Sequence, residues 1–289
     1  MRIVVTGASG QLGTDVVLLL QGENHDVLGC TRNNLNITDL EQCKKVIGTF
    51  LPEAVIHCAA YTAVDAAETD IDKAYQVNAV GTRNIAIASE QVGAKMIYIS
   101  TDYVFNGRSE LPYQEYDNTD PQGVYGKSKR AGELLVQNLS SRYFIVRTSW
   151  VYGLHGNNFV KTMLRLGQEK PSLQVVHDQK GSPTYTVDLA EFLLELVQTD
   201  KYGIYHASNS GECTWFEFAE AIFEEALNMG FNMIAKPEPC TTEQFPRPAP
   251  RPFNSVMDHL SIRINGLTDL RPWREGLHHY LIILSSIQS

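Results

Sequence analysis

The sequence has few cysteines, no long apolar run and no excess of basic residues. Its five cysteines are widely spaced and include no C-x-x-C pair, which argues against a disulfide framework and against a zinc site. No apolar stretch approaches the roughly 18 residues that a membrane-spanning helix needs. A formal net charge of −9 disfavours general binding to nucleic acids, because a phosphate backbone requires a basic surface. A small anionic substrate stays compatible, since a basic pocket can lie within an acidic protein.

The N-terminus shows no targeting segment, because the strand-like run RIVVTG begins at Arg2 and leaves no room for a signal peptide. We therefore expect a cytoplasmic protein with reduced thiols that binds neither membranes nor nucleic acids. With 289 residues, 43% of them hydrophobic, the chain can form one large α/β domain or a main domain with a smaller companion.

Short segments rich in β-branched residues alternate with helix-like segments over the first half of the chain. RIVVT, HDVLGC, AVIHCAA, KMIYIS and YFIVRTS are typical of buried parallel strands, the last one from about Tyr143 to Ser149. Between them lie an amphipathic run from about Gln11 to Gln21, a helix opened by a capping-box pattern of Thr38 with Glu41, and a helical region from about Asp70 to Val92. This alternation predicts a doubly wound parallel sheet.

Beyond Trp150 the alternation becomes irregular. We expect helices at NFVKTMLRLGQEK, TVDLAEFLLELVQ and TWFEFAEAIFEEALNMG, and an extended surface loop at CTTEQFPRPAPRPFNS, where prolines exclude regular structure. The predicted fold class is α/β: a Rossmann-like doubly wound parallel sheet with a smaller mixed α/β C-terminal substrate lobe. The dinucleotide-binding domain is expected to comprise residues 1–148 and about 182–206, and the substrate-binding lobe residues 149–181 and 207–289.

A glycine-rich turn, VTGASGQLG, follows the first strand and opens the first helix. Gly7 permits a tight turn, Gly10 lets backbone amides approach a pyrophosphate, and Gly13 lets helix and strand pack closely. The helix N-terminus offers free N–H groups and a positive dipole end to phosphates. Glycines also occur in ordinary strand-to-helix turns, but this position at the start of a βαβ unit indicates dinucleotide binding. We predict that Gln11 and Leu12 contribute to the same site.

An acidic residue is missing from the end of the second predicted strand, which reads GCTRNN. Sites for NAD usually place a carboxylate there to hold the ribose hydroxyls. Arg32 stands in this segment instead and could hold a 2′-phosphate, although a solvated surface arginine is the alternative. We therefore predict NADPH as the cofactor, with NADH as a second cofactor still open.

The stretch PQGVYGKSKRAGE allows two interpretations. G-K-S resembles the end of a P-loop, but the glycine that such a loop needs five residues before Gly126 is replaced by Pro121. The alternative is Y-x-x-x-K, in which Tyr125 and Lys129 lie one turn apart on a predicted helix. An ammonium beside a phenol stabilises the phenolate and lowers the phenol's pKa from about 10, which makes it a better proton donor. A buried tyrosine with a solvated lysine is the non-catalytic interpretation of the same motif.

A hydroxyl follows the fourth predicted strand, in IYISTDYVF. Thr101 falls at the carboxyl edge of the expected sheet, where open α/β sheets bind ligands. It could hydrogen-bond a substrate carbonyl beside Tyr125, or cap a turn. The segment between these two residues is longer than most structureless loops, and such loops are usually functional.

Together these residues resemble the extended short-chain dehydrogenase/reductase family. The matching segments are TGASGQLG, NAVGTRN, STDYVF and YGKSK, in that order. Within the family the chain is similar to the dTDP-4-dehydrorhamnose reductases, through AAYTAVDAAE, STDYVFNG, RTSWVYG, GNNFVKTML, GSPTYTVDLA and RPAPRPFNSVMD, which span nearly the whole chain.

The resemblance implies reduction of the C4 keto group of dTDP-4-dehydro-L-rhamnose (dTDP-6-deoxy-L-lyxo-4-hexulose) by NADPH. Tyr125 would protonate the developing alkoxide, Lys129 would hold the nicotinamide ribose, and Thr101 would hydrogen-bond the C4 oxygen. The implied binding residues are Ala59, Ala60 and Tyr61 for the cofactor, and Thr101, Asp102, Trp150 and Arg251 for the substrate. Some family members are linked to magnesium, but we assign no metal site.

Two alternatives stay open. An epimerase or dehydratase of another nucleotide sugar would share the fold, but such enzymes keep NAD tightly bound, which the missing acidic residue disfavours. A non-catalytic NADP-binding subunit, like the regulatory subunit of methionine adenosyltransferase, also resembles this family. The presence of Thr101, Tyr125 and Lys129 together favours catalysis. The oligomeric state also stays open, with a homodimer as one alternative.

Overall fold

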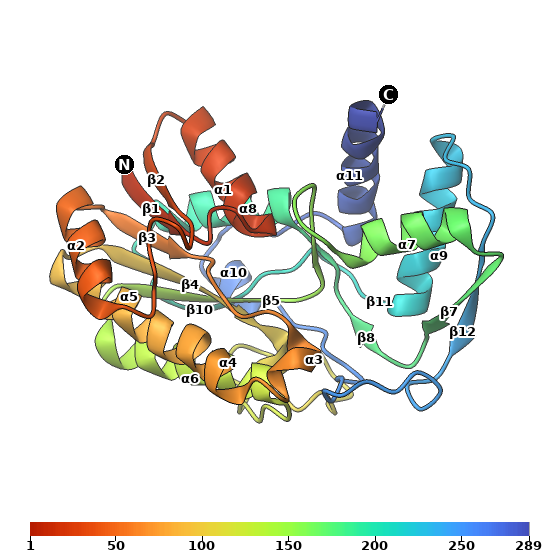
Figure 1. Cartoon of the computed structure of the whole chain (residues 1–289), viewed down its shortest axis with the longest axis horizontal. Coiled ribbons are helices and arrows are strands. Elements are labelled where there is room, and N and C mark those ends of the chain that lie inside the picture. The colour runs from red at the N-terminus through yellow and green to blue at the C-terminus, as the bar shows by residue number, and fades with distance from the viewer. Residues whose placement is uncertain (289) are drawn as a thin grey trace.

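A sheet of six parallel strands organises the computed structural model, which describes residues 1–288 (Figure 1). The strand order is β2-β1-β3-β4-β5-β10, so the chain changes direction across the sheet between β1 and β3. Open α/β sheets bind ligands in the crevice at such a switch point. The strands are β1 (Arg2–Thr6), β2 (Asp26–Cys30), β3 (Ala54–His57), β4 (Lys95–Thr101), β5 (Tyr143–Thr148) and β10 (Gly203–His206).

Both faces of this sheet are covered by helices, which explains why its strands read as unbroken apolar runs. On one face α1 (Gln11–Gly22) packs beside α8 (Thr186–Val197), with α10 (Leu260–Ile264) in the same core. On the other face lie α2 (Leu40–Phe50), α5 (Thr82–Gln91) and α6 (Val124–Leu139). In Figure 1, α1 and α8 lie above the sheet, and α5 and α6 lie below it. The predicted Rossmann-like fold class is confirmed.

Two local predictions on this side of the molecule need correction. Thr38 does not cap α2: Asp39 is the N-cap, and its carboxylate accepts the Gln42 backbone N–H, while the Thr38 hydroxyl donates to Asn36. The predicted helical region from Asp70 to Val92 is interrupted. It consists of α4 (Ile71–Tyr75), a π-helical segment η1 (Gln76–Gly81) and α5, and such π-helical segments are frequent at functional sites.

A smaller mixed lobe lies to the right of the sheet in Figure 1. Its helices are α7 (Phe159–Glu169), α9 (Trp215–Asn228) and α11 (Trp273–Gln288). Three short strand pairs complete it: β6 (Val151–Tyr152) with β9 (Thr184–Tyr185), β8 (Lys180–Gly181) with β11 (Cys213–Thr214), and β7 (Ser172–Val176) with β12 (Lys236–Cys240). Three connecting elements remain: α3 (Val64–Ala67), η2 (Asp102–Val104), and a loop after β12 that carries the proline-rich stretch.

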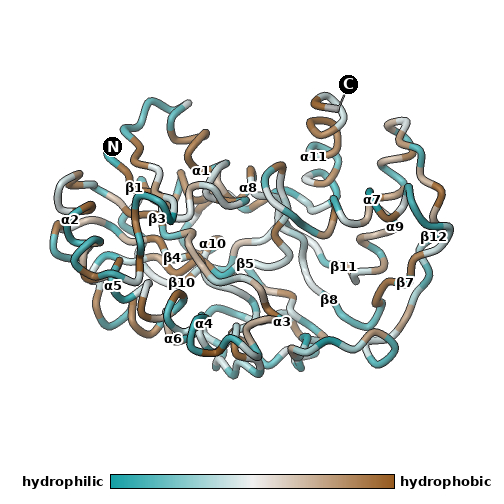
Figure 2. The backbone as a smooth tube through the Cα atoms, viewed as in Figure 1, coloured by the Kyte–Doolittle hydropathy of each residue, from teal (hydrophilic) through white to brown (hydrophobic). Residues whose placement is uncertain are grey.

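Hydrophobic segments run along the central strands, and hydrophilic ones lie on the outlying turns (Figure 2). The smaller lobe has its own buried core, to which Val160 of α7, Ile222 of α9 and Leu281 of α11 contribute. Within residues 1–288, no helix is both long enough and apolar enough to cross a membrane.

Candidate active site

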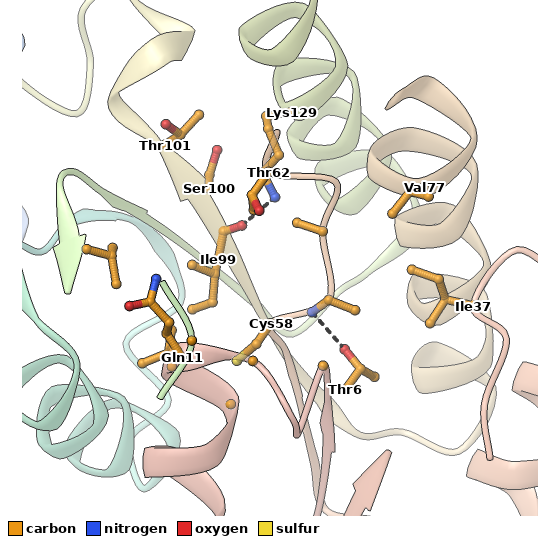
Figure 3. Close-up of a pocket in the computed structure, with 18 of the residues that line it drawn as sticks. Thr6, Gln11, Ile37, Cys58, Thr62, Val77, Ile99, Ser100, Thr101 and Lys129 are labelled. Carbon is orange, nitrogen blue, oxygen red and sulfur yellow. Dashed lines mark hydrogen bonds between the residues drawn. The ribbon is translucent and has the colours of Figure 1, made fainter. Parts of the chain in front are cut away.

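A cavity of about 1030 Å³ lies at the carboxyl edge of the central sheet (Figure 3). Its walls come from the turns after β1, β2 and β3, from the end of β4, from α6, and from the segment after β5. The predicted site residues that line it are Gly7, Gly10, Gln11, Leu12, Gly13, Arg32, Ala59, Ala60, Thr101, Asp102, Tyr125, Lys129 and Trp150. The fold therefore brings most of the predicted residues to one cavity.

The glycine turn adopts a geometry that requires glycine at two positions. Gly7 has a φ of +67°, and a Cβ atom there would lie 2.7 Å from the backbone nitrogen of Ala59. A Cβ atom on Gly13 would collide with the carbonyl oxygen of Gly7, so the start of α1 can lie close to β1 only without a side chain. Gly10 is the N-cap of α1 and has no side chain to occupy the free N–H groups. No side chain caps these groups, and Gln11, Leu12 and Gly13 of this first turn line the cavity, as an anion site needs.

Arg32 lies just beyond β2, is exposed, and lines the same cavity. In the described part of the chain its guanidinium forms no hydrogen bond or ion pair with another residue. The segment Thr31 to Asn34 contains no carboxylate. The end of β2 therefore presents an unpaired positive charge where an acidic residue would select NAD.

Lys129 is buried in α6, one turn after Tyr125, and is 2% exposed. Its Nζ atom donates to the carbonyl oxygen of Ile99 at 2.6 Å (Figure 3). The same atom lies 4.1 Å from the centre of the Tyr98 ring. The ring of Tyr103 meets the Tyr125 ring edge-on, with 5.5 Å between the ring centres. Thr101 ends β4 beside them, so α6 and β4 hold the three predicted catalytic residues.

Burial dominates the titration of both residues on α6. It lowers the pKa of Lys129 to about 7, against the opposing effect of Glu133 and Cys58. It also raises the pKa of Tyr125 to about 12, against a hydrogen bond with Thr101. Lys129 donates its hydrogen bond to Ile99 in the protein chain alone, and its effect on the pKa of Tyr125 stays a prediction.

The Thr101 hydroxyl donates to the Asp102 carboxylate at 2.8 Å. The same oxygen accepts the backbone N–H of Tyr103 at 3.2 Å. Asp102 is 3% exposed, and burial raises its pKa to about 6, partly offset by the bond from Thr101. A hydroxyl has one proton to donate. Thr101 can therefore donate to a substrate oxygen only when Asp102 does not take that proton, for example when Asp102 is itself protonated.

Trp150 lines the cavity and packs against the core of the smaller lobe. It has a φ of +47°, a conformation that a bulky residue rarely adopts, and its ring stacks on Trp215 with 3.5 Å between the centres and 9° between the planes. Gly181 makes room for this stack, because a Cβ atom there would lie 2.6 Å from the Trp150 ring. Unusual backbone conformations held by surrounding structure are concentrated at functional sites.

Two predicted residues lie outside the cavity lining. The Tyr61 hydroxyl donates to Asp70 at 3.0 Å, and the Arg251 guanidinium forms an ion pair with Asp65 at 2.8 Å. Their roles toward cofactor and substrate diphosphate stay predictions. Among residues 1–288, no group of three or more His, Cys, Asp or Glu side chains could hold a metal ion.

Two carboxylates that support the site were not identified from the sequence. Glu68 accepts the backbone N–H of Val124 at 2.8 Å and so caps α6 immediately before Tyr125. Glu133 lies buried one turn beyond Lys129 and bonds to Ser100 of β4. Each bond joins residues that are far apart in sequence, so no local pattern indicates it. Other lining residues, such as Ser9, Thr62, Tyr103 and Ser149, lie within the segments that carry the family resemblance, and this is their sequence signal.

The parallel sheet, the glycine turn at its switch point, and the Thr–Tyr–Lys set at the ends of β4 and α6 define a short-chain dehydrogenase/reductase, an NAD(P)H-dependent oxidoreductase. Comparison with known proteins narrows this class. The chain belongs to the family described as RmlD substrate binding domain, which matches residues 1–285. The sequence-based assignment to this family is confirmed.

Individual relatives match over almost their whole length. The chain is 45% identical to the spore coat polysaccharide biosynthesis protein SpsK of Bacillus subtilis, over 97% of this chain and 96% of that protein. It is 43% identical to a dTDP-4-dehydrorhamnose reductase of Mycobacterium tuberculosis, over 96% and 91%. The crystal structure of dTDP-4-dehydrorhamnose reductase from Bacillus anthracis in complex with NADP superposes with a TM-score of 0.94 at 48% identity, covering 97% of this chain and 98% of that one.

Proposed function

We propose that this protein reduces the C4 keto group of dTDP-4-dehydro-L-rhamnose to form dTDP-L-rhamnose, with NADPH as the reductant. The observation that carries the proposal is the common cavity: Thr101, Tyr125 and Lys129 line it together with the glycine turn and Arg32. The names of the relatives, several of them reductases of 4-keto dTDP sugars, support the same substrate class.

The residues around the cavity fit a phosphorylated dinucleotide. The glycine turn leaves the first N–H groups of α1 free for a pyrophosphate, and Arg32 supplies an unpaired cation for a 2′-phosphate. Ala59 and Ala60 are small enough for the cofactor to pass close to the backbone after β3. Lys129 lies deeper in the cavity, where it would hold the nicotinamide ribose.

Bound NADPH would supply the hydride to the C4 carbon. Tyr125 would donate its proton to the oxygen that becomes the C4 hydroxyl, and its pKa of about 12 keeps this proton in place at neutral pH. The charged form of Lys129 would stabilise the phenolate that remains until solvent returns a proton. Thr101 would donate a hydrogen bond to the same oxygen while Asp102 leaves its proton free.

Trp150 would form the wall against which the sugar is placed, with Arg251 available to the diphosphate if its ion pair with Asp65 opens. We also propose that the first lobe, residues 1–148 and about 182–206, binds the cofactor, and that the remainder binds the substrate. We further propose that the protein is a cytoplasmic homodimer and that it prefers NADPH to NADH. Its product would serve polysaccharide synthesis. The name of the Bacillus subtilis relative supports the last point.

The test is to mix the purified protein with the 4-keto dTDP sugar and NADPH and to follow the absorbance of the reduced nicotinamide. We expect oxidation that depends on the sugar in the wild type and is nearly absent in Tyr125→Phe. Undiminished turnover of Tyr125→Phe would contradict the proton donor. NADPH binding without any turnover would favour a regulatory subunit, and stoichiometric bound NAD in the purified protein would favour an epimerase.

A further inference from the structure

Glu133 is a fully buried carboxylate on the helix that carries Tyr125 and Lys129. One of its oxygens accepts from the Ser100 hydroxyl at 2.6 Å and from Arg147 Nε at 2.9 Å. The other accepts from Arg147 Nη2 at 3.0 Å and from Arg130 Nη1 at 2.9 Å. A single side chain thus joins α6 to β4 and β5, since Ser100 and Arg147 are direct neighbours across these strands.

These bonds keep Glu133 ionised despite its position. Burial alone would raise the pKa of its carboxyl, but Arg147, Ser100 and Arg130 together hold that pKa below the usual value. A buried carboxylate is costly unless it is paired and hydrogen-bonded, and Glu133 has both kinds of partner.

The contacts of Glu133 fix the position of α6 relative to β4, the two elements that carry the predicted catalytic residues. Ser100 immediately precedes Thr101 on β4, and Lys129 donates to the carbonyl of Ile99, the residue before Ser100 (Figure 3). The helix is therefore attached to β4 at two successive residues, one turn apart on α6. A shift of α6 along β4 would break both bonds and would move Tyr125 away from Thr101.

The charge of Glu133 acts on the same lysine. The groups that face Lys129 are Tyr98 of β4, His57 and Cys58 at the end of β3, and Tyr125 and Glu133 of α6. Burial lowers the pKa of His57 to about 3 and raises that of Cys58 to about 12, so both are uncharged at neutral pH. Burial also keeps Tyr98 and Tyr125 protonated, because it raises the pKa of each phenol. Of these groups, Glu133 alone is charged, and its charge favours the ammonium of Lys129.

We propose that Glu133 is a positioning residue of this catalytic centre: it sets α6 against β4 and supplies a negative charge that favours the ammonium of Lys129. The proposal rests on the proposed function, because Lys129 matters only if the cavity binds NADPH and reduces a keto group. Removing the carboxylate charge would do more than loosen the helix. It would leave Arg147 and Arg130 without their counter-charge. The positive charges of these arginines would then repel the ammonium of Lys129 and favour its neutral form.

The experiment compares the full-length wild type with Glu133→Gln, Arg130→Gln, Ser100→Ala and Asp188→Asn. Turnover of the 4-keto dTDP sugar with NADPH and the dissociation constant of NADPH are measured across pH, and each melting temperature is recorded. Asp188 is the matched control. It is a buried carboxylate paired with Arg271, and among residues 1–288 it forms no hydrogen bond or ion pair with a residue of α6.

For Glu133→Gln we expect kcat at neutral pH to fall about tenfold or more with a smaller change in KM for the sugar. The pH at which NADPH binding weakens should move down by about one unit, since a nearby charge shifts a pKa by about 1–3 units. Arg130→Gln removes a cation instead, so it should move that pH slightly upward. The Arg130 side chain is partly exposed, which makes unfolding a smaller risk than for the fully buried Glu133. Ser100→Ala should lower kcat without moving the pH dependence.

The proposal is overturned if Glu133→Gln has a lower melting temperature than the wild type, as Asp188→Asn should, but keeps the wild-type pH dependence of NADPH binding and turnover. If Glu133→Gln does not fold, the test moves to Arg130→Gln. The proposal is then overturned if the pH at which NADPH binding weakens is unchanged or lowered in that variant. Failure of the proposed function looks different: the wild type would then show no sugar-dependent turnover. The pH dependence of NADPH binding would still test the effect of Glu133 on Lys129.

Discussion

Asp102 offers a stability measurement that tests the electrostatics of the site without any substrate. Its carboxylate is buried beside Thr101, and burial raises its pKa from the usual 3.8 to about 6. One pKa unit corresponds to about 1.4 kcal/mol, so the ionised form costs the folded state about 3 kcal/mol. Asp102→Asn keeps the size of the side chain and removes this charge. The variant should therefore be more stable than the wild type at neutral pH.

The sign of the pH dependence follows from the direction of this shift. The folded protein holds the Asp102 proton more tightly than the unfolded chain, so protons bind on folding between pH 3.8 and about 6. The wild type therefore loses stability as the pH rises through this window, and Asp102→Asn does not. With about 2 °C per kcal/mol in a chain of this size, the variant should melt about 5 °C above the wild type near neutral pH. Most of that difference should vanish at about pH 4.5.

Differential scanning calorimetry across this pH range is the assay, with Asp188→Asn as the control. Asp188 is paired with Arg271, so its replacement leaves a cation without its partner and should lower the melting temperature. The reasoning is refuted if Asp102→Asn melts below the wild type at neutral pH, or if the gap between the two is the same at every pH.

Three further predictions concern the cofactor and the catalytic helix. Tyr125→Phe should lower kcat by about 10²–10⁴-fold in steady-state assays, while the ring contact with Tyr103 keeps the melting temperature close to that of the wild type. Arg32→Ala should reduce the affinity for NADPH about tenfold with little effect on NADH in fluorescence titrations, since a charge-assisted bond to the 2′-phosphate is lost. An unchanged ratio of the two affinities would contradict the cofactor assignment. Glu68→Ala should cost about 1 kcal/mol in urea denaturation, because it removes the cap on Val124, and an unchanged midpoint would show that the cap is dispensable.

The sheet was predictable because its strands are short, apolar and separated by helices of ordinary length. All five strands inferred from the first half of the chain are present. The sixth, β10, was not recognised as a strand, since GIYH is only four residues long and lies in the irregular half of the chain. The error at Thr38 has a local cause: Asp39 is an equally good cap one residue later, and a capping pattern does not decide between two adjacent candidates.

The site was predictable as far as its residues lie at the ends of strands, in the glycine turn, or in the Y-x-x-x-K motif at the start of α6. Topology places such residues together, which is why Gly7, Thr101 and Tyr125 meet at one cavity. The partners of a buried side chain depend on packing between distant segments. Glu133 with Ser100, and Arg251 with Asp65, are pairs of this kind. These pairs form only in the folded chain, and the spacing of residues in the sequence does not predict them.

The stack of Trp150 on Trp215 gives this protein a built-in optical probe. The chain has three tryptophans, and two of them lie face to face in the smaller lobe, with Trp150 also lining the cavity. Parallel indoles at this separation couple electronically, so their absorption bands split and their emission is quenched. A substrate that binds against Trp150 and shifts its ring relative to Trp215 would alter both signals. Binding at the cavity could therefore be recorded by circular dichroism and stopped-flow fluorescence on the unlabelled protein.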